Sequence, residues 1–200
     1  LFLDELAEFN RSVLELLRQP MEERCITVSR AKATVDYPAS FMLVAAMNPC
    51  PCGYYNHPTK QCTCPPGTVQ KYLSRVSGPL MDRVDIQIEI APVPFEKISN
   101  DAPAESSASI RQRVVAARRL QTERFRNCPG VHCNAQMGAK ETRLFATPDA
   151  DGLNKLERAM NAFGLSARAY DRILKVARTI ADLDNAPSVT GKHIAEAIGY

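Results

Sequence analysis

The sequence FMLVAAMNPCPCGYYNHPTKQCTC, which occupies residues 41–64, decides the fold that we predict for this chain. Its first seven residues, Phe41 to Met47, are all apolar. A run of this length predicts a strand that is buried on both faces of a parallel sheet. Asn48 follows the strand directly, at the end where open α/β sheets hold their ligands. We therefore expect an α/β fold with Asn48 at its ligand-binding edge, although an Asn before Pro49 is also a common turn opener.

The same stretch continues into a loop, residues 49–67, that contains five prolines and almost no aliphatic side chain. Such a loop cannot bury a core of its own, so it needs a metal or another staple to be ordered. Two Cys-x-Cys pairs lie in it with nine residues between them: Cys50, Cys52, Cys62 and Cys64. Four thiolates predict a closed, structural Zn²⁺ site. His57 as a substitute ligand, an iron–sulfur cluster and free thiols remain alternatives.

Composition is that of an ordinary globular protein, with 45% of the 200 residues hydrophobic. No apolar run reaches the roughly 20 residues that span a bilayer, and no signal-like segment begins the chain, so we expect a cytoplasmic protein. Seven cysteines are an odd number, which fits a metal site better than a disulfide framework. The net charge of +3 is too small to indicate a nucleic-acid partner by itself.

A second strand-like run, Leu1 to Leu3, ends at the acidic pair Asp4 and Glu5. The spacing of apolar residues predicts an amphipathic helix next, from Leu6 to Gln19, ended by Pro20. A strand, an acidic pair and a helix in this order match the Walker B arrangement, in which an Asp holds Mg²⁺ on a nucleotide and a Glu orients the attacking water. Acidic residues also favour a first helical turn because of the helix dipole, so the pair alone leaves both interpretations open.

Two further segments are predicted to be strands. From Arg24 to Tyr37, apolar residues alternate around a polar centre that contains Arg30 and Lys32, which predicts a β-hairpin with these side chains near its tip. A basic tip can contact phosphates, although charges on exposed hairpins are more often solvated. Val84 to Ile90 alternates in the same way and predicts a third strand. Arg83 at its entry could reach a phosphate or pair with a nearby acid.

Residues 93–108 are predicted to be a linker because they are rich in Pro, Ser and Ala. They separate an α/β part, residues 1–92, from an all-helical part, residues 109–200. Residues 130–146 of the helical part are predicted to be irregular. Four helices are predicted there, with caps at Ser109, Thr147, Ser166 and Thr190.

Arginines mark two of these helices. The first, from Ser109 to about Asn127, carries six arginines and a single acid, Glu123. A face this basic either meets phosphate or is solvated and paired with acids elsewhere. Arg168 lies in the first turn of the helix capped by Ser166, where the helix dipole disfavours a cation, so we expect a compensating anion there.

Four segments resemble the magnesium-chelatase-like AAA+ ATPases. They are LFLDELAEF at 1–9, NPCPCGYY with the later CTC at 48–64, YLSRVSGPLMDRVDIQIEI at 72–90 and LSARAYDRILKVARTIADL at 165–183. The resemblance covers essentially the whole chain. It implies a partial AAA+ core followed by an all-α lid, in a bacterial, hexameric, ATP-driven motor that acts on DNA and promotes branch migration in recombination and natural transformation. Two alternatives stay open, a chelatase-type motor that remodels a protein partner for metal insertion and a non-enzymatic, zinc-stabilised binding module.

The resemblance also implies roles for single residues around ATP and Mg²⁺. Asp4 and Glu5 match the Walker B pair. Asn48 matches the sensor-1 residue, which polarises the water near the γ-phosphate. Arg168 matches the sensor-2 arginine of the lid, which contacts the nucleotide.

Arg83 matches the arginine finger that is presented to the nucleotide of the neighbouring subunit. The family often has Ser before this arginine, where the chain has Asp82, so Arg75 is a competing finger candidate. The hairpin at 24–37 is similar to an insert that related helicases point into the central pore, which implies DNA contacts for Arg30 and Lys32.

One motif of this family is missing from the sequence. None of the nine glycines opens the phosphate-binding sequence G-x-x-x-x-G-K-[ST]. We therefore expect this loop upstream of Leu1 in a longer protein. We also expect that the chain by itself does not hydrolyse ATP.

Overall fold

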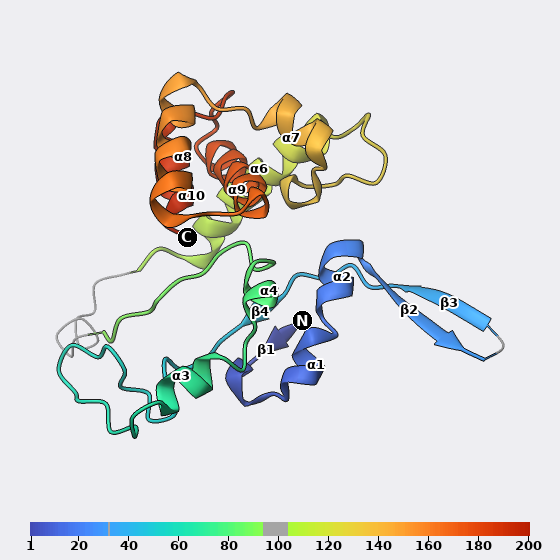
Figure 1. The fold of residues 1–200 in the computed structure, drawn as a ribbon. Coiled ribbons are helices and arrows are strands. Elements are labelled where there is room, and N and C mark those ends of the chain that lie inside the picture. The colour runs from blue at the N-terminus through green and yellow to red at the C-terminus, as the bar shows by residue number, and fades with distance from the viewer. Residues whose placement is uncertain (32, 94–103) are drawn as a thin grey trace. The chain divides into compact units, whose positions relative to one another are not determined.

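The structure, a computed structural model, describes residues 1–31, 33–93 and 104–200. Lys32 and most of the predicted linker therefore lie outside the described residues. The chain divides into two units, Leu1–Val84 with Glu89–Val93 and Asp85–Ile88 with Pro94–Tyr200. The first unit combines short strands with helices and the second is helical (Figure 1). This confirms the predicted class, a partial α/β core followed by a helical lid.

A parallel pair of strands begins the first unit. Strand β1 (Phe2–Leu3) pairs with β4 (Val44–Ala45), with Phe2 opposite Val44 and Leu3 opposite Ala45. The pairing continues past the strands, because the Leu6 N–H donates to the Ala46 carbonyl at 2.9 Å. The two apolar runs that the sequence indicated as strands are therefore neighbours.

The predicted seven-residue buried strand at Phe41 to Met47 is wrong in length and in burial. Only Val44–Ala45 is a strand, and Met42 is 77% exposed. A parallel sheet is buried only where other layers cover both its faces. Among the described residues β4 pairs with β1 alone, so these apolar side chains lack such a cover.

Three short helices follow β1 in place of the single predicted one: η1 (Leu6–Glu8), α1 (Arg11–Glu15) and α2 (Arg18–Glu23). Asn10 interrupts the run because its side chain caps α1, accepting from the Ser12 N–H at 3.1 Å. Pro20 does not end a helix. It lies in the first turn of α2, where a missing N–H costs no helical hydrogen bond.

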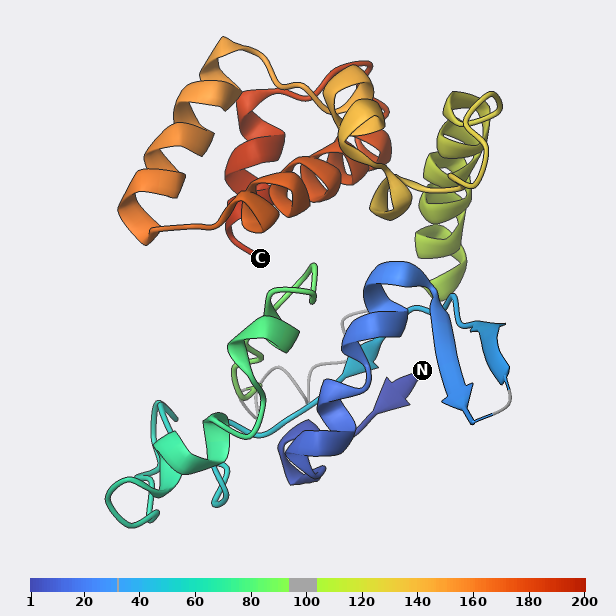
Figure 2. The same ribbon diagram turned by 45° about the vertical axis from the view of Figure 1, so that its right-hand side comes forward.

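The predicted hairpin is confirmed. Strands β2 (Cys25–Arg30) and β3 (Ala33–Pro38) are antiparallel, with Ile26 opposite Tyr37 and Arg30 opposite Ala33. In both views the hairpin extends away from α1 and the parallel strands (Figures 1 and 2). Arg30 therefore lies at the far end of a projecting element.

Helices α3 (Thr68–Leu73) and α4 (Gly78–Met81) complete the first unit. They bring Tyr72, Val76 and Leu80 into a core with Leu6, Ala7 and Leu14. This core holds η1, and with it the turn that follows β1, against the α3–α4 segment.

The third predicted strand, Val84 to Ile90, is not formed. Its alternating isoleucines are exposed, Ile90 by 82%. A strand needs a partner ladder, and within the described residues no strand pairs with this segment. The Gln87 N–H instead donates to the Tyr200 carbonyl at 2.9 Å.

The second unit is built from helices around one core. Its elements are α6 (Ser107–Arg124), η2 (Asn134–Gln136), α7 (Ala139–Phe145), α8 (Ala150–Phe163), α9 (Ala167–Leu183) and α10 (Gly191–Ile198). Leu156 of α8, Ile173 and Ala177 of α9, and Ile194 of α10 are buried together. Helix α9 is central in this unit, since α6, α7 and α10 all contact it.

Two predicted caps are confirmed and two are wrong. Ser166 and Thr190 cap α9 and α10 as predicted. Helix α6 begins earlier than predicted, because the Ser106 side chain, not that of Ser109, accepts the capping hydrogen bond. Helix α8 is capped by Asp149 and not by Thr147. Residues 130–146 are not irregular throughout, because they contain η2 and α7.

No helix within the described part of the chain has the length and apolar character needed to cross a membrane.

Candidate functional site

The parallel pairing of β1 and β4 brings the predicted catalytic side chains to one edge. Asp4 and Glu5 directly follow β1, and Asn48 follows β4 after two intervening residues. Because the strands are parallel, all three lie at their carboxyl ends. This is the edge at which open α/β sheets bind ligands. The catalytic roles of the three residues stay predictions.

Glu5 has an unusual backbone at this edge. Its φ of 52° and ψ of 44° lie in the left-handed region, which costs a non-glycine residue about 1 kcal/mol. The Glu5 N–H donates to Asp4 Oδ1 at 2.9 Å, so the two residues form one tight turn. Backbone conformations of this kind cluster at functional sites, where the surrounding structure maintains them.

Arg75 contacts the residues that follow the Asp4–Glu5 turn. Its Nη1 donates to the Ala7 carbonyl at 3.0 Å and to Glu8 Oε2 at 2.9 Å. Both acceptors belong to η1, which directly follows the acidic pair. In this structure Arg75 therefore contacts the short helix that follows the candidate Walker B pair of its own chain.

Arg83, the predicted arginine finger, is largely buried. Only 8% of its side chain is exposed, and Nη2 lies 2.7 Å from Glu22 Oε1 of α2. Its Nη1 also donates to the Pro79 carbonyl. The guanidinium is thus paired with an acid of its own chain, which is one of the alternatives that the sequence left open.

Three further residues were predicted to contact phosphate, and the structure describes two of them. Arg30 is exposed near the hairpin tip. Lys32 is outside the described residues. Arg168 is exposed in the first turn of α9, in the helical unit, while the acidic pair and Asn48 belong to the first unit.

The four cysteines of the loop converge, as the sequence predicted. The Sγ atoms of Cys50, Cys52, Cys62 and Cys64 all lie within 4.8 Å of one another. Three of the Sγ pairs are separated by 3.4, 3.8 and 3.6 Å. Tetrahedral Zn²⁺ with bonds of about 2.3 Å requires sulfur atoms about 3.8 Å apart. The spacing of the four sulfur atoms is therefore compatible with a four-coordinate ion.

Backbone groups of the loop support this cluster. The N–H groups of Tyr54 and Thr63 lower the pKa of Cys52 to about 5, so this thiol is ionised at neutral pH and suited to bind a metal. The Tyr55 N–H donates to the buried Cys50 Sγ at 3.3 Å. His57 is not a member of the cluster, since its Nδ1 accepts from two N–H groups within the loop.

A buried ionic cluster that the sequence did not indicate stabilises the helical unit. The side chain of Asp182 accepts from Arg124 at 2.7 Å, from Asn134 at 2.8 Å and from Arg178 at 3.1 Å. Burial raises the pKa of Asp182, but the hydrogen bonds from Arg124 and Asn134 outweigh it, so the pKa lies below its usual value. The i, i+4 spacing of Arg178 and Asp182 was the only local signal, and it does not reveal Arg124.

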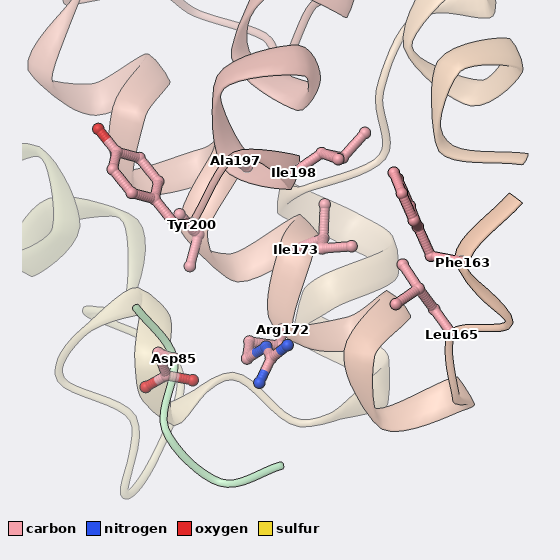
Figure 3. A pocket seen from close by; sticks show the side chains of 9 residues that line it. Asp85, Phe163, Leu165, Arg172, Ile173, Ala197, Ile198 and Tyr200 are labelled. Atoms are coloured by element: carbon pink, nitrogen blue, oxygen red, sulfur yellow. The ribbon is translucent and has the colours of Figure 1, made fainter. Parts of the chain in front are cut away.

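A cavity of 220 Å³ also lies in the helical unit. Figure 3 shows Asp85 and Arg172 on one side of it and the apolar Phe163 and Leu165 on the other. Burial raises the pKa of Asp85, and Lys175 and Arg172 act in the opposite direction. Small-molecule sites usually measure about 300–1,000 Å³. This cavity is too small to hold a nucleotide by itself.

Comparison with known proteins shows the family of the chain. Residues 1–98 match the family described as magnesium chelatase, subunit ChlI, and residues 104–200 match magnesium chelatase, subunit ChlI C-terminal. The chain belongs to the magnesium-chelatase-like family, as its sequence motifs predicted.

Within that family the similarity is to proteins of the ComM and YifB type. Competence protein ComM of Haemophilus influenzae and YifB of Escherichia coli are each 44% identical to the chain over 201 residues. A Mycobacterium bovis protein is 37% identical over 200 residues. Each match covers all of this chain, which spans only 38–39% of the length of these relatives.

Proposed function

We propose that the chain is part of an AAA+ ATPase that moves DNA strands, as a branch-migration motor in recombination and natural transformation. The observation that carries the proposal is the parallel pairing of β1 with β4, which puts Asp4, Glu5 and Asn48 at one ligand-binding edge. Two carboxylates and a neutral amide at such an edge are among the groups that ATP hydrolysis uses.

Each of the three side chains at this edge would have a different role in ATP hydrolysis. Asp4 would hold Mg²⁺, which when bound neutralises charge on the phosphates of ATP. Glu5 would accept a hydrogen bond from the attacking water and orient it. Asn48 would polarise the same water through its amide, without adding charge to an acidic site. The loop that grips the phosphates would be supplied by the remainder of the longer protein.

DNA as the substrate is supported by the name of one relative and by one element. The Haemophilus influenzae relative is named a competence protein, and the sequence motifs resemble those of motors that act on DNA. The hairpin β2–β3 projects from the first unit with Arg30 near its tip, where a guanidinium can meet a phosphate. The proposed assembly is a hexamer that acts in the cytoplasm and holds this hairpin in a central pore.

The family description favours a second candidate function. Both matched families are named for magnesium chelatase, so an ATPase that remodels a protein partner during metal insertion shares the same core. Steep loss of DNA affinity with rising salt separates the two, because phosphate contacts release counterions. A chain that only binds, with the four cysteines as a zinc-stabilised module, would show neither ATP hydrolysis nor this salt dependence.

The proposal is tested in the full-length protein with Glu5→Gln. Removing a group that orients the water should lower the ATPase rate by about 100-fold or more, while ATP binding persists. The matched control is Glu157→Gln, which changes an exposed glutamate of α8 in the same way and should leave the rate unchanged. Equal rates for wild type and Glu5→Gln would refute the assignment. ATPase activity of the 200-residue chain alone would contradict the separate expectation that this chain does not hydrolyse ATP by itself.

A further inference from the structure

The six arginines in and directly after α6 differ in their partners, which the sequence could not show. Four have a partner from the same unit. The pairs are Arg113 with Glu105, Arg118 with Gln121, Arg124 with Asp182 and Arg126 with Glu123. These contacts use both acids of this segment and one acid of α9.

Arg111 and Arg119 are different. Both are exposed, and within the part of the chain that the structure describes neither side chain makes a hydrogen bond or an ion pair. Helix α6 contains one acid, Glu123, and Arg126 is paired with it. A solvated helix face usually interleaves acids and bases four residues apart. In α6 no acid lies four residues from Arg111, and Glu123, four residues after Arg119, is the acid that Arg126 binds.

The positions of these arginines define one surface. Arg118 and Arg119 follow Arg111 by seven and eight residues, which is close to two helical turns, so all three lie on the same side of α6. Along the helix axis, Arg111 is about 10–12 Å from the other two. Val115 is exposed between them. We call these four residues the outer face of α6. The spacing lets each end of this face meet a different phosphate.

The rest of the helix makes this face rigid. Ala117 and Gln121 are buried on another side of α6, and Phe125 at its end packs into the core of the unit. Arg124 is held by the buried Asp182. The outer face is therefore presented by a helix whose position is set by packing and by a buried ion pair, which reduces the entropy lost on binding.

We propose that the outer face of α6 binds the sugar–phosphate backbone of DNA. The inference rests on the proposed function, which supplies DNA as the partner. Guanidinium groups bind phosphate oxygens through two parallel hydrogen bonds, and Val115 adds apolar contact with a sugar. Contacts to phosphate carry no sequence information, so binding through them is independent of base sequence.

The test uses the full-length protein with both Arg111→Ala and Arg119→Ala, and a fluorescently labelled DNA duplex at several salt concentrations. Each phosphate contact contributes about 0.9 to the slope of log affinity against log salt. Losing two should lower the slope by about 1.8 and, at about 0.1 M monovalent salt, weaken binding by about 60-fold. The loss should be the same for unrelated DNA sequences.

Two further variants isolate the effect of this face. Arg113→Ala with Arg126→Ala removes the same charge, but from arginines already paired with acids, and should change the slope less. Arg111→Lys with Arg119→Lys keeps the charge and should retain most of the slope. Unchanged basal ATPase activity without DNA would show that the Arg111→Ala/Arg119→Ala protein is folded.

The outcomes separate this inference from the proposed function. If the wild type shows no salt-dependent DNA binding, the DNA partner and this inference both fail. If the wild type binds DNA and the Arg111→Ala/Arg119→Ala protein binds equally well, only the outer face is refuted. An equal loss in the Arg113→Ala/Arg126→Ala control also refutes it, since net charge alone would then explain binding.

Discussion

Replacing Asp182 by asparagine should strongly destabilise the helical unit. The substitution keeps the size of the side chain but removes the negative charge between Arg124 and Arg178. The Asp182 side chain is fully buried and that of Arg178 is 2% exposed, so water cannot replace the lost partner. Breaking a buried ion pair by removing one partner costs about 3–5 kcal/mol. We expect a loss of this size in the free energy of unfolding.

The assay is urea unfolding of the chain, followed by far-UV circular dichroism because the chain has no tryptophan. The control is Asp184→Asn, an acid two residues away that pairs with Lys192 at the surface and should contribute little. A loss below about 1 kcal/mol for Asp182→Asn, or one equal to that of the control, would refute the reasoning, because it would mean that the buried arginines do not need this charge.

The pH dependence follows from the sign of the pKa shift. The pKa of folded Asp182 lies below its ordinary value, so the stabilisation is fully present above the unfolded pKa of about 3.9. It is lost as the pH falls through the folded pKa. Wild-type stability should therefore decrease more steeply than that of Asp182→Asn as the pH falls below about 4. Parallel curves for the two proteins would contradict this assignment.

Two further predictions concern the first unit. Cys62→Ser should lower the zinc content and the thermal stability together, because the loop has no core to replace the metal. A chelator should have the same two effects on the wild type. Mass spectrometry measures the zinc and calorimetry the stability, and lost zinc with unchanged stability would contradict the prediction. In the full-length protein, Arg75→Ala should lower kcat by about 10-fold with little change in KM. The reason is that the substitution frees the turn after the acidic pair without touching the nucleotide. Steady-state ATPase assays check this, and a change in KM alone would contradict the prediction.

Much of the candidate site could be predicted because its signals are local. The order of strand, acidic pair and helix places Asp4 and Glu5 after β1, and the apolar run places Asn48 after β4. The spacing of the cysteines likewise predicted a cluster that the structure forms. A short loop between paired cysteines restricts their distance whatever the rest of the fold does, which explains why this prediction needed no tertiary information.

Other features depend on groups far apart in the chain, and for these sequence patterns are insufficient. Val84 to Ile90 has the alternation of a strand, but a strand exists only where a partner offers its hydrogen bonds. The apolar run at Phe41 to Met47 predicted burial, but burial requires a covering layer. In both segments the sequence pattern indicates which secondary structure is possible, but it does not indicate which other segment packs or pairs with it.

By itself, the sequence determined the hairpin and the four-cysteine cluster, because these depend on local order and spacing, and the resemblance of its motifs gave the family and the class of fold. Only the tertiary structure decided the partner of each arginine. It paired Arg83 with Glu22, Arg75 with the turn after Glu5, and Arg124 with Asp182, while Arg111 and Arg119 stayed exposed on α6. The physical reason is that a long, flexible cation pairs with whichever acid the fold brings within reach, and no local pattern encodes that distance.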